Sequence, residues 1–133
     1  MSIHIVQLGS PRLPSEGLRI GTVRRPPRGV PKSEFACRNY FDVWYPELAP
    51  SPEVMAPGQA AQHSAETQDW QKFHKAFRKE MASPPASRTL DMLAALSHHT
   101  QFSIGCYCAE ETLCHRSILR KLLQERGADV RCA

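Results

Sequence analysis

The stretch QFSIGCYCAEETLCHRSILRKLLQERG, residues 101–127, decides the expected fold of this chain. Residues 101–108 are typical of a β-strand, and residues 113–126 repeat apolar side chains at the spacing of one helix face. Gly127 is suited to end that helix, and residues 128–132 can return as a last strand. Helical patterns flank the first of these strands on both sides, so we expect it to be central, with both faces covered.

Two further strands are expected near the start of the chain. Residues 3–8 carry β-branched side chains and stop at Gly9, while residues 18–23 alternate apolar and polar side chains. Strands that alternate with helices predict a parallel or mixed sheet with helices packed on it.

Two helices are expected between the second strand and residue 101. The first places an apolar stripe on one face, with Ser64 or Thr67 as the residue that caps its start. This stripe consists of Trp70, Phe73, Phe77 and Met81. The second helix is expected to be capped by Ser87 and to run to about His98. A stripe of this kind is typical of a face that packs on the core.

The chain as a whole, residues 1–133, is expected to be a single α/β domain, because 133 residues suit one core and not two. It contains 11 prolines, so part of its length must be irregular. Three prolines and a glycine in residues 24–31 exclude helix and central strand there. We therefore expect long proline-rich loops, one of them stiff and rich in arginine.

The five cysteines indicate in which cellular compartment the protein works. Their odd number, the absence of a signal-like start and the close pair Cys106 and Cys108 argue for reduced thiols. No run approaches the roughly 18 apolar residues of a membrane span. These features predict a cytoplasmic protein with no membrane partner.

Basic residues are concentrated between Arg12 and Arg38. This segment holds seven basic and two acidic residues, a net charge of 7 − 2 = +5 against +4 for the whole chain. Such a segment is either solvated or faces an anion. Aromatic residues gather between residues 35 and 45, a pattern more typical of core packing than of a stacking platform.

The turn after the expected central strand carries the candidate site. With Thr112 as N-cap, the first turn of the next helix would contain Cys114, His115 and Arg116. The helix dipole and the arginine favour a thiolate at Cys114, which makes Cys114 and His115 candidate catalytic residues. A cation in a first helical turn is unfavourable unless an anion offsets it, either Glu110 or Glu111 nearby or a bound ligand. We expect a ligand that Arg116 binds together with Arg28.

Two other interpretations of the cysteines stay open. They can be inert packing residues, since Cys114 lies four residues before Ile118 on the expected buried helix face. They can also bind a metal ion such as zinc or iron, provided that three sulfurs and one ring nitrogen converge. The four ligands would be Cys106, Cys108, Cys114 and His115.

Several short motifs in order resemble the bacterial domain-of-unknown-function family 488, which includes the YeaO-like proteins. The motifs are Val23-Arg-Arg-Pro-Pro-Arg-Gly-Val30, Trp44-Tyr-Pro-Glu-Leu-Ala-Pro-Ser51, Trp70-Gln-Lys-Phe73, Cys108-Ala-Glu-Glu and Cys114-His-Arg116. The chain departs from the family pattern at the proline loop, where it lacks an aspartate and a tryptophan. The resemblance implies an α/β fold and joins Arg28 to the cysteine turn, but it implies no particular activity.

Two functional hypotheses follow, and neither decides between an enzyme and a binding module. The first is a site for an anionic ligand, a nucleotide or a nucleic-acid phosphate, at the turn Cys106–Arg116 with the Arg28 loop. The second is a cysteine-centred metal or thiol redox site, with the basic loop merely solvated.

Overall fold

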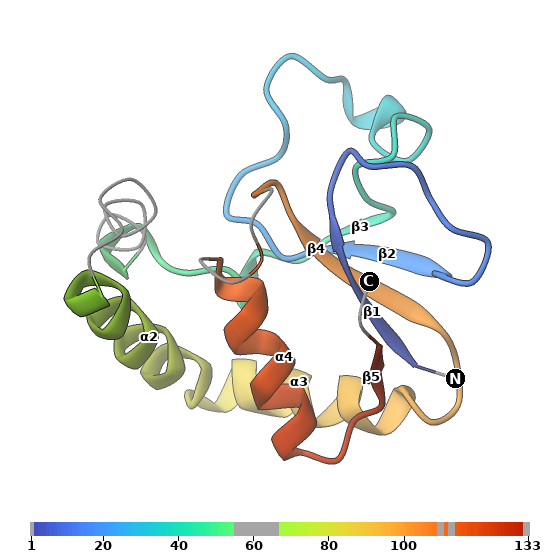
Figure 1. Ribbon diagram of the computed structural model, residues 1–133. Coiled ribbons are helices and arrows are strands. Elements are labelled where there is room, and N and C mark those ends of the chain that lie inside the picture. Colours follow the sequence, from blue (N-terminus) through green and yellow to red (C-terminus); the bar gives the residue numbers. More distant parts are fainter. Residues whose placement is uncertain (1, 55–66, 109–110, 112–113, 132–133) are drawn as a thin grey trace.

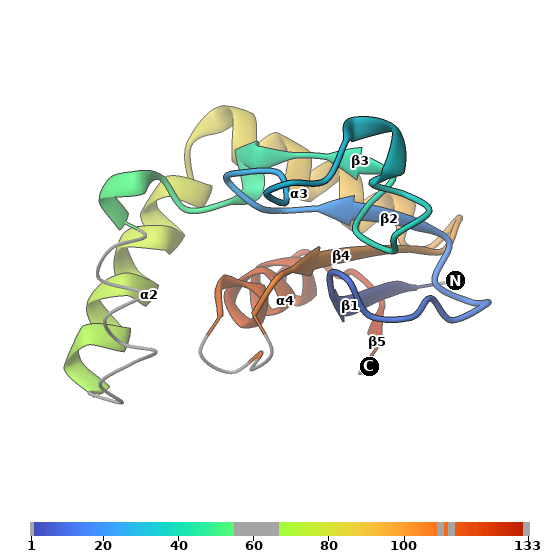
Figure 2. The same ribbon diagram turned by 90° about the horizontal axis from the view of Figure 1, so that it is seen from above.

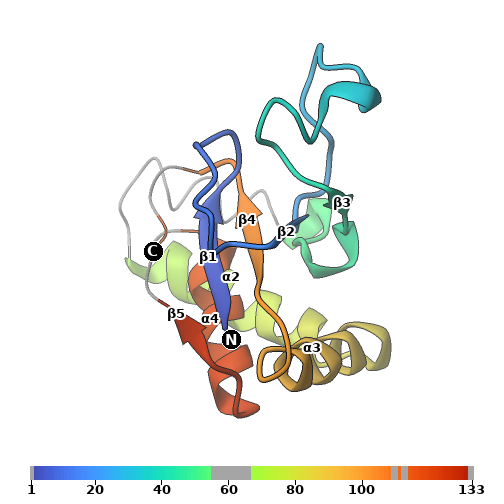
Figure 3. The ribbon, with the colours of Figure 1, turned by 90° about the vertical axis from the view of Figure 1, so that its right-hand side faces the viewer.

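Strand β4 (Phe102–Cys106) lies at the centre of a five-stranded sheet whose order is β3-β2-β4-β1-β5. The computed structural model describes residues 2–54, 67–108, 111 and 114–131. The other strands are β1 (Ile3–Gln7), β2 (Leu18–Gly21), β3 (Val43–Trp44) and β5 (Val130–Arg131). Every strand pair is parallel. Figure 2 shows this order from above, and Figure 3 shows β1 and β4 running side by side in the same direction.

The register places apolar residues of the central strands side by side. Ile104 lies opposite Ile5 of β1 and Ile20 of β2, and every residue of β4 is buried. Continuous burial is what a central parallel strand requires. The prediction that this strand is central, with the next helix beginning beyond its carboxyl end, is therefore confirmed, as is the α/β class.

Three described helices pack on one face of the sheet. They are α2 (Thr67–Met81), α3 (Pro84–Leu96) and α4 (His115–Glu125). Their apolar faces form one core with the side chains of Ile3, Ile5, Phe102 and Ile104. In Figure 1 these helices lie to the lower left of the sheet, and the loops before β2 and β3 lie to its upper right.

The opposite face is covered by loops, so both faces of the central strand are covered as expected, with the described α-helices on one of them. A second, smaller cluster there consists of Val6, Leu8, Val23, Phe41, Cys106 and Cys114. A Cβ at Gly21 would collide with the Phe41 ring, so the glycine in β2 lets this loop approach the sheet closely.

A buried arginine holds these loops in place. Arg19 is fully buried; its guanidinium pairs with Glu16 at 2.7 Å and donates to the carbonyl oxygens of Ser10 and Asn39. The backbone N–H of Arg19 donates to Asp42. The terminal nitrogens of one charged side chain thus connect the loop before β2 to the loop before β3, although its Nε has no partner in the described structure.

The helix starts differ from those expected. Helix α3 is capped by Ser83 and not by Ser87, because Pro84 and Pro85 have the fixed φ that suits a first helical turn. Thr67 is the first residue of α2, and Ser64 lies outside the described residues.

The aromatic expectations are confirmed in part. Phe73, Phe77 and Met81 are buried and Trp70 is half-buried. In the segment 35–45, Phe41 is buried but Trp44 is exposed. No helix within the described part of the chain has the length and apolar character needed to cross a membrane.

We predict that Phe77→Ala lowers the free energy of unfolding by about 3–5 kcal/mol, the usual cost of removing a buried aromatic side chain. Phe77 has no exposed surface, stacks on Phe73 and contacts the ring of His115. Met92→Ala is the control, because Met92 on α3 is exposed and should change stability by less than about 0.5 kcal/mol. Equal effects of the two substitutions in urea melts would contradict this placement of the core.

Candidate functional site

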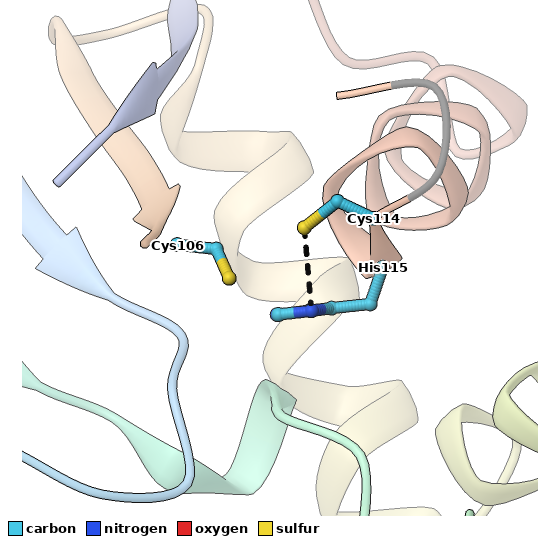
Figure 4. Close-up of side chains that lie close together, drawn as sticks. All are labelled: Cys106, Cys114 and His115. Atoms are coloured by element: carbon cyan, nitrogen blue, oxygen red, sulfur yellow. Dashed lines mark hydrogen bonds between the residues drawn. The ribbon is translucent and has the colours of Figure 1, made fainter. Parts of the chain in front are cut away.

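Three residues of the candidate site meet where β4 ends and α4 begins. Cys106 is the last residue of β4, Cys114 is the N-cap of α4, and His115 is its first residue. Figure 4 shows their side chains pointing toward one another. Their ligating atoms all lie within 4.8 Å of one another, and all three residues are buried. The convergence that a metal site requires is therefore present for three of the four candidate ligands.

Two distances define the cluster more closely. The Sγ atoms of Cys106 and Cys108 are 3.8 Å apart, and Sγ of Cys114 is 3.7 Å from Nδ1 of His115. Cys108 is half-buried, and its sulfur is not one of the atoms that all lie within 4.8 Å of one another. We call these four residues, Cys106, Cys108, Cys114 and His115, the Cys-His cluster.

The ring of His115 is held in one orientation and one tautomer. Its Nε2 lies 2.6 Å from the carbonyl oxygen of Thr22, so this nitrogen must carry the proton and donate it. Nδ1 is then left with a lone pair facing Cys114. Burial lowers the pKa of His115 to about 4, so the ring is neutral at pH 7. The ring of Phe77 packs edge-on against it at 5.6 Å.

The pKa values of Cys106 and Cys114 are shifted in opposite directions. Hydrogen bonds from the thiols of Cys106 and Cys108, helped by the backbone N–H and the charge of Arg116, lower the pKa of Cys114 despite its burial. The same hydrogen bonds raise the pKa of Cys106, which acts as a donor, and burial raises it further. The sulfur of Cys114 is thus favoured as a thiolate while Cys106 keeps its proton.

The side chain of Arg116 donates hydrogen bonds to the backbone of β1 and of the turn that follows β4. It is 3% exposed, and its two terminal nitrogens donate to the carbonyl oxygens of Val6 at 2.7 Å and Cys108 at 2.6 Å. Its Nε has no hydrogen-bond partner in the described structure. The anion expected to offset this first-turn cation is available within the chain, since the thiolate of Cys114 lies close enough for its pKa to be lowered by the charge.

The remaining site residues are placed apart from this group. Arg28 is exposed and lines a different pocket from Arg116. The expected cap Thr112 lies outside the described residues, and the cap position is occupied by Cys114. Cys37 is exposed, whereas Cys114 is 1% exposed. A higher reactivity of Cys114 stays a prediction, and its burial means that a reagent must first gain access.

Sequence reasoning missed Thr22 and the role of Phe77 beside His115. Thr22 follows β2, and its N–H and hydroxyl both donate to the carbonyl oxygen of Gly105 in β4. The signal for Thr22 was the parallel sheet itself, because the carboxyl ends of neighbouring parallel strands meet at one edge. A backbone carbonyl carries no residue-specific signal, so its contact with His115 needed the structure.

The geometry of the cluster suits a tetrahedral metal ion. Sulfur atoms bound at about 2.3 Å from zinc lie about 3.8 Å from one another. The sulfur–sulfur distance of 3.8 Å between Cys106 and Cys108 is close to this separation. A metal-binding histidine usually donates its second ring N–H to a backbone carbonyl or carboxylate, as His115 does to Thr22.

Comparison with known proteins identifies the class and then the subclade. The model of a family described as the active DUF488-N3 subclade, DUF488-N3a, matches residues 3–127. The chain therefore belongs to the DUF488 family. No curated protein and no solved structure matches it.

We predict that His115 in metal-free protein carries its proton on Nε2 and stays neutral at pH 6. Its folded pKa of about 4 lies below the ordinary value of 6.5. The stability that the neutral ring contributes is therefore complete above about pH 6.5 and is lost as the pH falls toward 4. Nitrogen-15 NMR of the histidine rings measures both properties, with His115→Gln to assign the signal. A proton on Nδ1, or a charged ring at pH 6, would contradict the geometry.

Proposed function

We propose that the chain binds a thiophilic divalent metal ion, zinc in the first place, through the Cys-His cluster. The observation that carries the proposal is the convergence of ligating atoms from Cys106, Cys114 and His115 within 4.8 Å. Cys108, with its sulfur 3.8 Å from that of Cys106, supplies the fourth ligand. Three sulfurs and one imidazole nitrogen are a common donor set for zinc in proteins.

The charges of the site favour this assignment. Metal-bound cysteines are thiolates, so binding must release protons from the cluster. Three thiolates and one Zn²⁺ ion carry a net charge of −1, which the buried guanidinium of Arg116 offsets. Cys114 is already favoured as a thiolate, and His115 is neutral, so two of the four ligands are ready for the metal.

A metal at this place would join separate parts of the sheet. Cys106 belongs to β4, Cys114 and His115 begin α4, and the hydrogen bond from His115 leads to the end of β2. Binding would therefore stabilise the turn between β4 and α4 as well as the edge of the sheet. Reduced thiols are required, which agrees with the cytoplasmic location that we predict from the sequence.

The hypothesis of one anion shared by Arg28 and Arg116 receives less support from the geometry. Both terminal nitrogens of Arg116 donate to backbone carbonyl oxygens. Arg28 lines a separate pocket, which we consider below for an anionic ligand of its own.

The test is elemental analysis of protein purified under reducing conditions, combined with a titration of free thiols. We expect one zinc per chain and protection of the cluster cysteines from alkylation until a chelator is added. Cys106→Ser, Cys114→Ser and His115→Gln should each weaken zinc binding by at least about tenfold to a hundredfold, judged by competition with a chelating dye. Cys37→Ser is the matched control, since Cys37 is exposed and outside the cluster.

Cys108→Ser decides what kind of metal site this is. A loss of affinity like that of Cys106→Ser means a closed site with four protein ligands, which is typical of a structural role. Unchanged affinity means three protein ligands and an open position, which is typical of catalytic zinc. Metal-free protein with fully titratable thiols, and no zinc uptake on titration, would refute the proposal and leave the thiol redox alternative.

A further inference from the structure

A pocket of about 750 Å³ lies beside the cysteine turn, between the proline loop and the aromatic residues before and in β3. We call it the arginine-aromatic pocket; its walls include Arg24, Arg25, Arg28, Tyr40, Trp44 and Tyr107. Tyr107 stands between Cys106 and Cys108 in the chain, so one wall of the pocket continues into the Cys-His cluster. Among the described residues, no acidic side chain lines this pocket.

Two of the three arginines are available for a ligand. Arg25 and Arg28 are exposed, and their side chains form no hydrogen bond or ion pair within the described part of the chain. Arg24 is committed in part, since it donates to the carbonyl oxygens of Ala49 and Pro50. Arginines brought together without a carboxylate partner attract an anion, and phosphate accepts their bonds in pairs.

The aromatic rings are exposed but fixed. Trp44 is 43% exposed and its indole N–H donates to the carbonyl oxygen of Val23 at 2.8 Å. Tyr107 is 36% exposed and its hydroxyl donates to the carbonyl oxygen of Arg25 at 2.9 Å. Tyr40 meets Tyr107 edge to face at 6.2 Å. Rings held by their polar ends present their faces without further ordering, which suits the stacking of a planar group.

The conformation of the proline loop is also restricted. Pro26 and Pro27 restrict the backbone between Arg25 and Arg28, and Gly29 has a φ of +72° that lets the chain turn after Arg28. The hydroxyl of Tyr107 anchors the loop at Arg25. The arginines therefore project from a stiff and anchored segment.

From this arrangement we infer that the arginine-aromatic pocket binds a nucleotide, with the phosphate on Arg25 and Arg28 and the base against Trp44 and Tyr107. Inorganic phosphate alone would leave the exposed aromatic faces uncovered, and 750 Å³ is within the range of pockets for ligands larger than a simple ion. Both parts of a nucleotide are matched: charge by the arginines, and a planar face by the rings. The nucleotide can be free or part of a single strand, and the inference does not depend on metal binding.

The test is calorimetric titration of the full chain with adenosine monophosphate, adenosine, ribose 5-phosphate, inorganic phosphate and a short single-stranded oligonucleotide. Adenosine monophosphate should bind at least about tenfold more tightly than adenosine or inorganic phosphate, because only it uses both halves of the pocket. The double variant Arg25→Ala/Arg28→Ala should weaken this binding by at least about tenfold. The variant Trp44→Leu should weaken binding of the nucleotide but not that of phosphate.

The matched control is Lys32→Ala/Arg38→Ala, which removes the same charge from exposed residues outside the pocket. It should change nucleotide binding by less than about twofold. The oligonucleotide can bind more tightly than adenosine monophosphate, with the same losses in the arginine and Trp44 variants. That result supports the pocket and identifies single strands as the source of the nucleotide. Equal binding of phosphate and nucleotide, an equal loss in the control, or no binding at all would overturn the inference.

Metal content measured on the same samples keeps this result separate from the metal proposal. Arg25→Ala/Arg28→Ala should retain the zinc content of the parent chain, because neither arginine contacts the Cys-His cluster in the described structure. Loss of nucleotide binding with zinc intact, or the reverse, shows which of the two proposals has failed. A thermal melt of each variant confirms that it is folded.

Discussion

The hydrogen bond from Nε2 of His115 to the carbonyl oxygen of Thr22 joins the start of α4 to the end of β2 at 2.6 Å. It selects the tautomer of the ring and leaves Nδ1 facing the sulfur of Cys114. The hydroxyl of Thr22 donates to the carbonyl oxygen of Gly105 in the central strand. The orientation of the His115 ring is therefore fixed relative to the sheet. The position of the first residue of α4, and with it the Cys-His cluster, depends on this contact.

Much of the fold could be predicted because apolar patterns dominate it. The run Phe102–Cys106 is buried throughout, and the stripe of Phe73, Phe77 and Met81 faces the core. The expected cap at Ser87 was wrong because two prolines favour an earlier start of α3 at Ser83. Covering of the second face by loops depends on Arg19, a charged residue whose burial no apolar pattern indicates.

The residues of the candidate site could be predicted from the sequence, but the hydrogen bonds between them and the rest of the chain could not. Cys106, Cys114 and His115 share a turn between a strand and a helix, so their proximity follows from local sequence. Arg116 shows the limit of such reasoning. Its position in the first helical turn suggested an anion, either a nearby glutamate or a bound ligand, whereas the structure gives its terminal nitrogens two backbone carbonyls and places the sulfur of Cys114 nearby. Long-range backbone contacts of this kind leave no trace in residue spacing.

The two proposed sites meet at Tyr107, the residue between Cys106 and Cys108. Its ring forms a wall of the arginine-aromatic pocket, while its neighbours belong to the Cys-His cluster. A change of the cluster on metal binding would therefore act directly on that wall. The half-buried Cys108 is the member of the cluster best placed to respond to a ligand in the pocket.

X-ray absorption at the zinc edge tests the central claim most directly, because it counts the atoms bound to the metal in the intact protein. We expect about three sulfur atoms at about 2.3 Å from the zinc ion and one nitrogen atom at about 2.0–2.1 Å from it. A first coordination sphere made only of nitrogen and oxygen atoms would show that any bound zinc lies elsewhere, and would contradict the assignment of Cys106, Cys108, Cys114 and His115 as its ligands.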